Sequence, residues 1–208
     1  MSVSFPPEKQ KKLSLKELES YLWKSLDIFR PAIEISECKE YLLGILSLKY
    51  LSDTFEEAQE NLRHSLDRKG KSTKEINLFI EDPNNYSNIF FIPKNSRWND
   101  IRNSLNVISN IGLSLNKSTQ SIEDQNPGLS GVLSSINFDI NNKKINQAFK
   151  ELIDYFSIYK ITNANFEKTG LLGQATEYLI KMFSDSEGKM GGQFYTPNEV
   201  IKLLIDLV

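Results

Sequence analysis

Hydrophobic residues recur at intervals of three and four positions along nearly the whole chain, which is the spacing of one face of an α-helix. The first such stretch opens with Ser14 and Glu17, whose spacing matches a capping box. Pro31 ends it after about Arg30. The apolar positions of this stretch are Leu15, Leu18, Leu22, Leu26 and Phe29. We therefore predict an all-α fold, a helical bundle-like domain with at most one short strand.

Residues 36–69 are predicted to form either one long helix or two helices with a bend near Ser52-Asp53. Between residues 41 and 51 the sequence is apolar almost all the way round, which is typical of a helix that is buried on every side. Gly70 follows and suits a C-terminal cap. We expect this stretch to lie at the centre of the domain.

Shorter elements are predicted for the rest of the chain. A second capping box, Ser72 and Glu75, starts a short helix that ends at Asp82-Pro83. Residues 88–93 form the clearest non-helical apolar segment, which favours a short extended strand before Pro93. The other predictions are helices over about 98–117, 143–156, 171–184 and from 196 onward, a loop over 126–142 and a polar connection over 162–170.

Composition excludes several classes of protein. The 25 Lys and Arg residues against 27 Asp and Glu give a net charge of −2, so the chain is not a polycation that binds nucleic acid by bulk charge. One cysteine, Cys38, and one histidine, His64, exclude an intramolecular disulfide and a multi-Cys or His-pair metal site. No run reaches the roughly 18 apolar residues of a membrane helix. We expect a soluble, cytoplasmic protein without a membrane segment.

The most informative motif lies near the C-terminal end, at residues 189–200. Thr196 suits a helix N-cap, Pro197 the first helical position, and Glu199 the third position of a capping box. The pair Gly191-Gly192 lets backbone amides approach a ligand closely. A helix start with exposed N–H groups suits an anion such as a carboxylate or phosphate. On these residues alone, an ordinary junction between a loop and a helix is the interpretation that we favour.

The segment Gly-Gly-Gln-Phe-Tyr-Thr-Pro at 191–197, followed by Val-x-x-Leu-Leu, resembles the block upstream of the catalytic domain in modification subunits of type I restriction-modification systems. These subunits are N6-adenine DNA methyltransferases. The resemblance covers about residues 14–208, because further segments occur in the order that the family shows. They are Tyr21 to Arg30, Glu40 to Glu56, Phe90 to Pro93 with Arg97-Trp98, Asn126 to Leu133, Leu172 to Phe183 and Glu187 to Lys189.

The resemblance implies a role for the phenylalanine-tyrosine-threonine-proline segment, which contacts S-adenosylmethionine in that family. The cofactor-binding residues carried over to this chain are Gln193, Phe194, Tyr195, Thr196, Pro197 and Asn198. Amides and the Thr196 hydroxyl at a helix start suit the methionine carboxylate. In the isolated chain, Tyr195 and Thr196 should lie at the surface. The resemblance also implies four partners: a specificity subunit, a second modification subunit, an endonuclease and translocase subunit, and double-stranded DNA bound through the complex.

We expect residues 1–13 to be a disordered basic arm, 14–185 the N-terminal helical domain, and 186–208 the loop and first helix of a Rossmann-like methyltransferase domain. The last helix is still apolar at Val208, so we expect a further domain after it. The family's Gly-x-Gly loop and Asn-Pro-Pro-Phe catalytic block do not occur here, so no catalytic residue is assigned and these 208 residues should be inactive alone.

Two alternatives stay open. The chain could be a non-enzymatic helical module that acts through protein contacts, or the start of a fused type IIG-like methyltransferase and nuclease. Lesser candidate features have ordinary structural interpretations that we favour. A basic cluster of Arg63, His64, Arg68, Lys69 and Lys71 suits a solvated helix end. We expect Cys38 to be partly buried, and Trp23 and Trp98 to pack in the core.

Overall fold

The computed structural model describes residues 12–105, 107–140 and 142–186. Within these ranges the fold consists of seven α-helices joined by loops and short 3-10 turns, and it contains no β-strand. The helices are α1 (Leu15–Phe29), α2 (Ile35–Arg68), α3 (Thr73–Phe79), α4 (Trp98–Ser104), α5 (Ile111–Gln125), α6 (Lys143–Phe156) and α7 (Leu171–Ser186). The predicted all-α class is confirmed.

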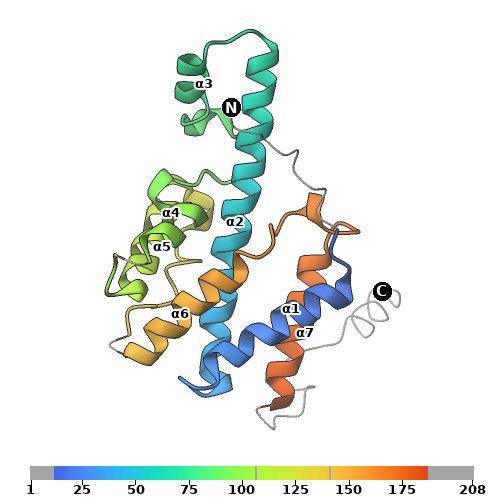
Figure 1. Ribbon diagram of the computed structural model, residues 1–208, viewed down its shortest axis with the longest axis vertical. Coiled ribbons are helices and arrows are strands. Elements are labelled where there is room, and N and C mark those ends of the chain that lie inside the picture. Colours follow the sequence, from blue (N-terminus) through green and yellow to red (C-terminus); the bar gives the residue numbers. More distant parts are fainter. Residues whose placement is uncertain (1–11, 106, 141, 187–208) are drawn as a thin grey trace, which may run out of the picture.

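Helix α2 is one continuous helix of 34 residues and forms the axis of the molecule. At a rise of about 1.5 Å per residue it is roughly 50 Å long, longer than the rest of the bundle. Helices α1 and α7 lie on one side of it, and α4, α5 and α6 on the other (Figure 1). Gly70, with φ +73°, takes the left-handed conformation that ends the helix, as predicted.

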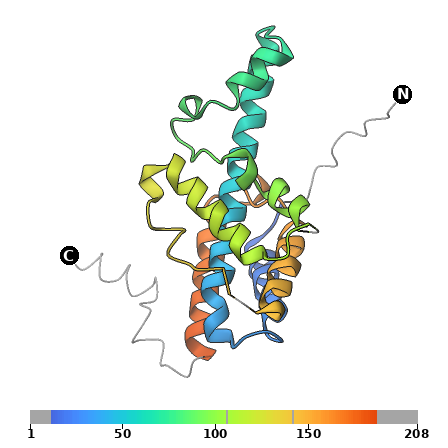
Figure 2. The same ribbon diagram turned by 90° about the vertical axis from the view of Figure 1, so that its left-hand side faces the viewer.

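The two views agree that α3 lies beside the far end of α2, away from α1, α6 and α7 (Figure 2). We call this part, residues 56–86, the distal hairpin. Leu66, Ile76 and Ile80, with Leu62 packed against them, form a small apolar cluster there that is separate from the main core. The distal hairpin therefore has its own packing and meets the bundle only where it begins and ends.

Both predicted capping boxes are confirmed. The Ser14 hydroxyl accepts from the Glu17 N–H, and the Glu17 carboxylate accepts from the Ser14 N–H. Ser72 and Glu75 make the same reciprocal pair at the start of α3. These contacts satisfy N–H groups that have no partner within the helix, which explains why the sequence located both starts.

Two sequence predictions are wrong. The helix expected over 98–117 is two helices, because α4 ends at Ser104 and α5 begins at Ile111. Asn110 caps α5 by accepting from the Leu113 N–H, and a side chain that caps a new helix interrupts the old one. Residues 88–93 are non-helical, as predicted, but form no strand.

A side chain takes the place of a neighbouring strand at residues 88–93. Asn126 accepts from the Phe91 N–H at 2.9 Å and donates to the Phe91 carbonyl at 2.8 Å. Both backbone groups of Phe91 are thus satisfied without a sheet.

The main core contains buried residues from α1, α2, α4, α5, α6 and α7, and it includes a cluster of aromatic rings. Phe29 from α1, Tyr41 from α2 and Phe149 from α6 meet there. Phe138, from the predicted loop 126–142, completes the cluster by packing on Tyr41 and Phe149. None of the described helices is long and apolar enough to cross a membrane.

Candidate functional site

Helix α7 leads directly toward the motif at 189–200, so its packing decides how firmly the helical domain holds that segment. Its buried side chains recur every four residues: Leu171, Ala175, Leu179 and Phe183. They face α1 and α2, and α7 crosses behind α1 (Figure 1). The predicted cofactor residues, Gln193 to Asn198, lie outside the described residues, as do Tyr195 and Thr196 of the surface prediction.

A buried ion pair holds the chain that enters α7. The Lys49 ammonium lies 2.8 Å from Asp53 Oδ1, and both side chains are at most 4% exposed. The second oxygen, Asp53 Oδ2, accepts from the backbone N–H of Ile161 at 2.6 Å. Because Ile161 lies 108 residues further along the chain, this contact fixes the connection 157–170 onto α2.

Burial governs the ionisation of this group of side chains. It lowers the pKa of Lys49, although the neighbouring Asp53 carboxylate opposes the shift. Burial also raises the pKa of Glu56, one turn along α2, and the Asp53 charge adds to that effect. The Lys49 ammonium lies 5.2 Å from the centre of the Trp98 ring, which partly compensates its lost hydration.

Trp98 joins the same centre to the end of α6. Its backbone N–H donates to the Ser52 hydroxyl at 2.7 Å, and its indole N–H donates to the Ser157 hydroxyl at 2.8 Å. Trp98 is buried, as predicted, whereas Trp23 is only partly buried and lies under the Arg30 guanidinium. One buried centre on α2 therefore positions the start of α4, the end of α6 and the approach to α7.

The N-terminal end of the described chain is tied to the same connection. Leu13, the last residue of the predicted basic arm, is buried and forms an isolated parallel bridge with Phe166. The Leu13 N–H donates to the Asn165 carbonyl, and the Glu167 N–H donates to the Leu13 carbonyl. The start of α1 and the loop before α7 are thus held together by backbone hydrogen bonds.

An ion pair attaches the distal hairpin to the bundle. The Arg97 guanidinium donates to both oxygens of Glu81, at 3.0 and 2.6 Å, and to the Ile92 carbonyl. It also lies 5.0 Å from the centre of the Phe55 ring. The hydrogen bonds from Arg97 hold the pKa of Glu81 below its ordinary value.

Three residues of the basic cluster at the tip of the distal hairpin contact side chains of the same hairpin. His64 lies 3.0 Å from Glu60, and Lys71 lies 3.3 Å from Glu75. Arg63 donates to Asn77. This arrangement agrees with the predicted solvated helix end. No group of His, Cys, Asp and Glu side chains within residues 12–105, 107–140 and 142–186 has the arrangement of a metal site.

Cys38 is more deeply buried than the sequence suggests, at 1% exposed. Burial raises the pKa of its thiol to about 11, against the smaller effects of a backbone hydrogen bond and of Arg30. A position near the start of a helix lowers the pKa of a thiol, but here this effect is smaller than that of burial. The Cys38 thiol therefore stays protonated at neutral pH.

The Lys49–Asp53 pair is not among the features predicted from the sequence. A local signal was present, because Lys49 interrupts an apolar run and Asp53 follows it by one helical turn. The partners Ile161 and Trp98 left no such signal, because they lie far away in the sequence.

Comparison with known proteins gives two consecutive family matches. The HsdM N-terminal domain family matches residues 18–156, and the N-6 DNA methylase family matches residues 167–208. The chain is 29% identical to the type I restriction enzyme MjaIX methylase subunit of Methanocaldococcus jannaschii, over 92% of this chain and 35% of that protein. It is 25% identical to the MpnII methylase subunit of Mycoplasma pneumoniae, over 95% of this chain and 40% of that protein. The chain thus spans about two fifths or less of these relatives.

The fold also resembles a solved structure. The crystal structure of the type I restriction-modification system methyltransferase subunit from Streptococcus thermophilus superposes with a TM-score of 0.63 at 21% identity. The match covers 89% of this chain and 42% of that one, and it supports the fold alone. The match to residues 18–156 covers more than half of the chain. The chain therefore belongs to the HsdM N-terminal domain family, and it continues into the start of an N-6 DNA methylase region.

Proposed function

We propose that this chain is the N-terminal part of the methyltransferase subunit of a type I restriction-modification enzyme. The intact subunit would transfer a methyl group from S-adenosylmethionine to adenine N6 in DNA. The two consecutive family matches support this proposal, as do the names of the relatives. The chain contains neither Gly-x-Gly nor Asn-Pro-Pro-Phe, so these 208 residues should have no methyltransferase activity alone.

The observation that carries the proposal is the position of α7. By family match, α7 belongs to the methylase region, yet its apolar face is buried against α1 and α2. The buried Lys49–Asp53 pair and the Leu13–Phe166 bridge fix the loop that precedes it. The helical domain would therefore hold the start of the methylase region rigidly, so that a movement of one is transmitted to the other.

The cofactor segment proposed for this chain remains Gln193 to Asn198. Its donor set fits S-adenosylmethionine, because a Thr hydroxyl and helix-start amides suit a carboxylate and the rings of Phe194 and Tyr195 suit a sulfonium cation. When bound, the cofactor supplies the methyl group. The residues of this segment would bind and orient it, while the ribose and adenine would be held by residues beyond residue 208.

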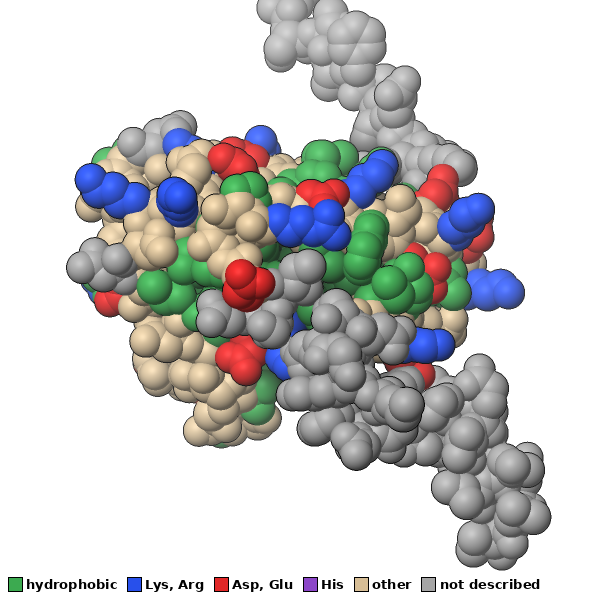
Figure 3. Space-filling view, turned by 90° about the horizontal axis from the view of Figure 1, so that it is seen from below, with side chains coloured by type: hydrophobic (Ala, Val, Ile, Leu, Met, Phe, Trp, Pro, Cys, Tyr) green, Lys and Arg blue, Asp and Glu red, His purple; other side chains and the backbone are tan. Residues whose placement is uncertain are grey.

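The proposed partners are a specificity subunit, a second modification subunit, an endonuclease and translocase subunit, and double-stranded DNA, in the cytoplasm. The charge of this chain supports different roles for these partners. On the end of the bundle shown in Figure 3, Lys and Arg side chains alternate with Asp and Glu, and the net charge is −2. A surface of mixed charge suits a subunit that assembles with others and leaves sequence recognition to a partner.

Isothermal calorimetry with S-adenosylmethionine tests the cofactor proposal. It compares this chain with one extended through the downstream reading frame. We expect the extended chain to bind and Thr196→Ala to weaken that binding by about tenfold, the effect of one or two lost hydrogen bonds. Thr169→Ala is the matched control, because Thr169 is exposed in the loop before α7. Failure of the extended chain to bind would refute the cofactor site.

The downstream reading frame also distinguishes the proposed methyltransferase from the two alternative functions. A Gly-x-Gly loop followed by Asn-Pro-Pro-Phe supports the methyltransferase. A stop codon in the native gene after Val208 supports the non-enzymatic helical module. A nuclease motif on the same polypeptide supports the fused type IIG-like enzyme.

A further inference from the structure

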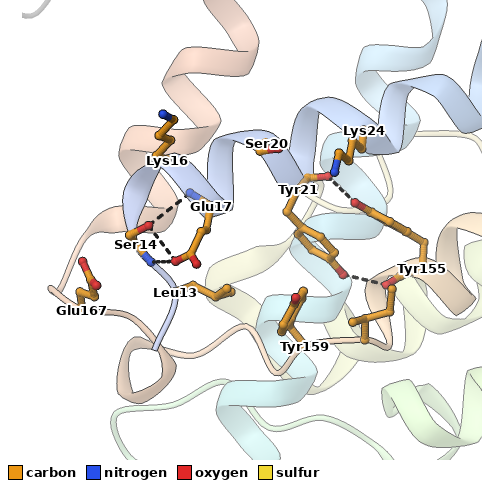
Figure 4. Close-up of a pocket in the computed structure, with 11 residues that line it drawn as sticks. Leu13, Ser14, Lys16, Glu17, Ser20, Tyr21, Lys24, Tyr155, Tyr159 and Glu167 are labelled. Carbon is orange, nitrogen blue, oxygen red and sulfur yellow. Dashed lines mark hydrogen bonds between the residues drawn. The ribbon is translucent and has the colours of Figure 1, made fainter. Parts of the chain in front are cut away.

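A groove of about 680 Å³ runs along the outer face of α1 (Figure 4). One wall is a stripe of α1 that includes Lys16, Ser20 and Lys24. Glu167 lies at one end of the groove, and Leu13 lies next to it. The other residues that line it are Ser14, Glu17, Tyr21, Tyr155, Ile158, Tyr159 and Glu167. The groove therefore combines an aromatic surface with charged side chains along its length.

Hydrogen bonds fix the aromatic surface in place. The Tyr21 hydroxyl donates to the Tyr155 carbonyl at 2.8 Å, and the Tyr155 hydroxyl donates to the Tyr21 carbonyl at 3.0 Å. Their rings stack with centroids 4.6 Å apart, and the Tyr159 ring meets Tyr21 edge-on at 5.1 Å. Next to these rings, Ile158 leaves 54% of its surface exposed. The groove is thus preformed and rigid, and its apolar surface is not covered by any of the residues that the structure describes.

A rigid surface of tyrosine rings is the kind of surface that binds proline-rich peptides. Such peptides adopt the extended polyproline II conformation, whose proline rings pack into aromatic grooves at little cost in entropy. This chain contains one Pro-Pro pair, in Phe5-Pro6-Pro7-Glu8, a few residues before Leu13. We propose that Phe5-Pro6-Pro7 of the same chain binds in this groove, against Tyr155, Ile158 and Tyr159.

The length of the N-terminal segment fits this proposal. Pro7 precedes Leu13 by six residues, which span about 19 Å in the polyproline II conformation. From Leu13 to Tyr21, α1 advances only about 12 Å. The remaining 7 Å or so allow the chain to reverse direction before α1 begins. Leu13 itself is held near this end of the groove by its bridge to Phe166, so the segment starts from a fixed point.

The charged residues along the groove are also complementary to those of the N-terminal segment. Glu167 is exposed next to Leu13, where Lys9 and Lys11 of the segment would lie. Further along the groove, Lys16 and Lys24 are exposed, and neither pairs with a carboxylate among the described residues. Glu8, next to the proline pair, would reach these ammonium groups. The sequence alone predicts a disordered basic arm, whereas the groove gives its apolar part a binding site.

Paramagnetic relaxation in the full chain tests the proposal. A nitroxide is attached to Ser4→Cys in a Cys38→Ala background, and the methyl signal of Ile158 is compared with those of Ile180 and Val132. The reference is the same labelled chain with Phe5→Ser, Pro6→Ser and Pro7→Ser, which measures the broadening that tethering alone produces. We expect the parent chain to broaden Ile158 strongly above this reference, with no such difference at Ile180 or Val132.

Charge reversal in the groove supplies a second variant that leaves the segment intact. Lys16→Glu with Lys24→Glu should return the Ile158 broadening toward the reference, because Glu8 would be repelled. Lys117→Glu with Lys144→Glu makes the same change in charge at exposed sites on α5 and α6, and should have no effect. Equal broadening in the parent and in the triple serine variant would overturn the proposal. Broadening that passes from labelled chains to separate isotope-enriched chains would instead assign the groove to a second copy, and would overturn it as well.

Discussion

At the scale of single residues, Glu123 on α5 organises the loop that follows it. Its carboxylate accepts from the N–H groups of Gly131, Leu133 and Ser134 and from the Ser134 hydroxyl. A glutamine has only one acceptor oxygen, and its amide would place a donor against these donors. We expect Glu123→Gln to lower the free energy of unfolding by about 1–3 kcal/mol in urea denaturation. The exposed neighbour Asp124→Asn is the control and should change it by less than about 0.5 kcal/mol.

The same side chain makes stability depend on pH. Burial alone would raise the pKa of Glu123, but the hydrogen bonds from Ser134, Gly131 and Leu133 outweigh it and hold the pKa below the ordinary 4.5. A carboxyl whose pKa is lower in the folded state stabilises fully above its unfolded pKa and loses this effect as the pH falls through the folded value. The difference between the parent and Glu123→Gln should therefore shrink as unfolding is measured at successively lower pH below about 4.5. A constant difference down to pH 2 would contradict this origin.

The buried Lys49–Asp53 pair predicts a larger effect. Asp53→Asn leaves the Lys49 ammonium buried beside a neutral amide, and burial already lowers the pKa of Lys49. Removing one partner of a buried pair costs about 3–5 kcal/mol, which we expect in the unfolding free energy. Asp154→Asn is the matched control, because it breaks the exposed pair with Arg102 and should cost at most about 1 kcal/mol. Similar costs at the two sites would show that water reaches Asp53.

At the scale of secondary-structure elements, two helical glycines should respond oppositely to the same substitution. A Cβ atom at Gly112 in α5 would lie 1.9 Å from the Phe138 carbonyl oxygen, so the backbone of the loop would have to move. A Cβ atom at Gly173 in α7 would meet no atom within 4 Å. Gly112→Ala should destabilise by about 1–3 kcal/mol through overpacking, whereas Gly173→Ala should stabilise by about 1 kcal/mol through helix propensity. Thermal unfolding of both variants would show whether the sign differs as expected.

The elements that the sequence located correctly are those whose signals are local. Ser14 and Ser72 satisfy N–H groups within three residues, so their capping boxes are visible in the sequence. The break between α4 and α5 was missed because apolar residues keep a helical spacing through it, and only the cap at Asn110 interrupts the helix. The short strand predicted over 88–93 does not form, because Asn126, 35 residues away, takes the place of a strand partner and leaves no signal near this segment in the sequence.

In the molecule as a whole, one part of the candidate site could be predicted from local sequence, and the other part could not. The motif at 191–197 is contiguous, so the sequence alone suggests a cofactor segment. The support behind it depends on contacts between distant residues, such as Asp53 with Ile161 and Leu13 with Phe166. Hydrophobic spacing predicts that α7 has a buried face, but it does not identify α1 and α2 as the helices that cover it.

The two apolar clusters predict that the distal hairpin opens without the rest of the molecule. Its cluster is separate from the main core, and the Arg97–Glu81 ion pair joins it to the bundle. Glu81→Gln should therefore accelerate hydrogen exchange of the amides of Ile76 in α3 and of Ile80, the residue that follows α3, by about fivefold, equivalent to about 1 kcal/mol. Exchange in α6 should not change. Lys71→Gln breaks the exposed pair with Glu75 in the same hairpin and should have little effect, because both side chains are at least half exposed. Equal acceleration in α3 and α6 would show instead that the hairpin and the bundle unfold as one unit, and that the Arg97–Glu81 pair stabilises the whole molecule.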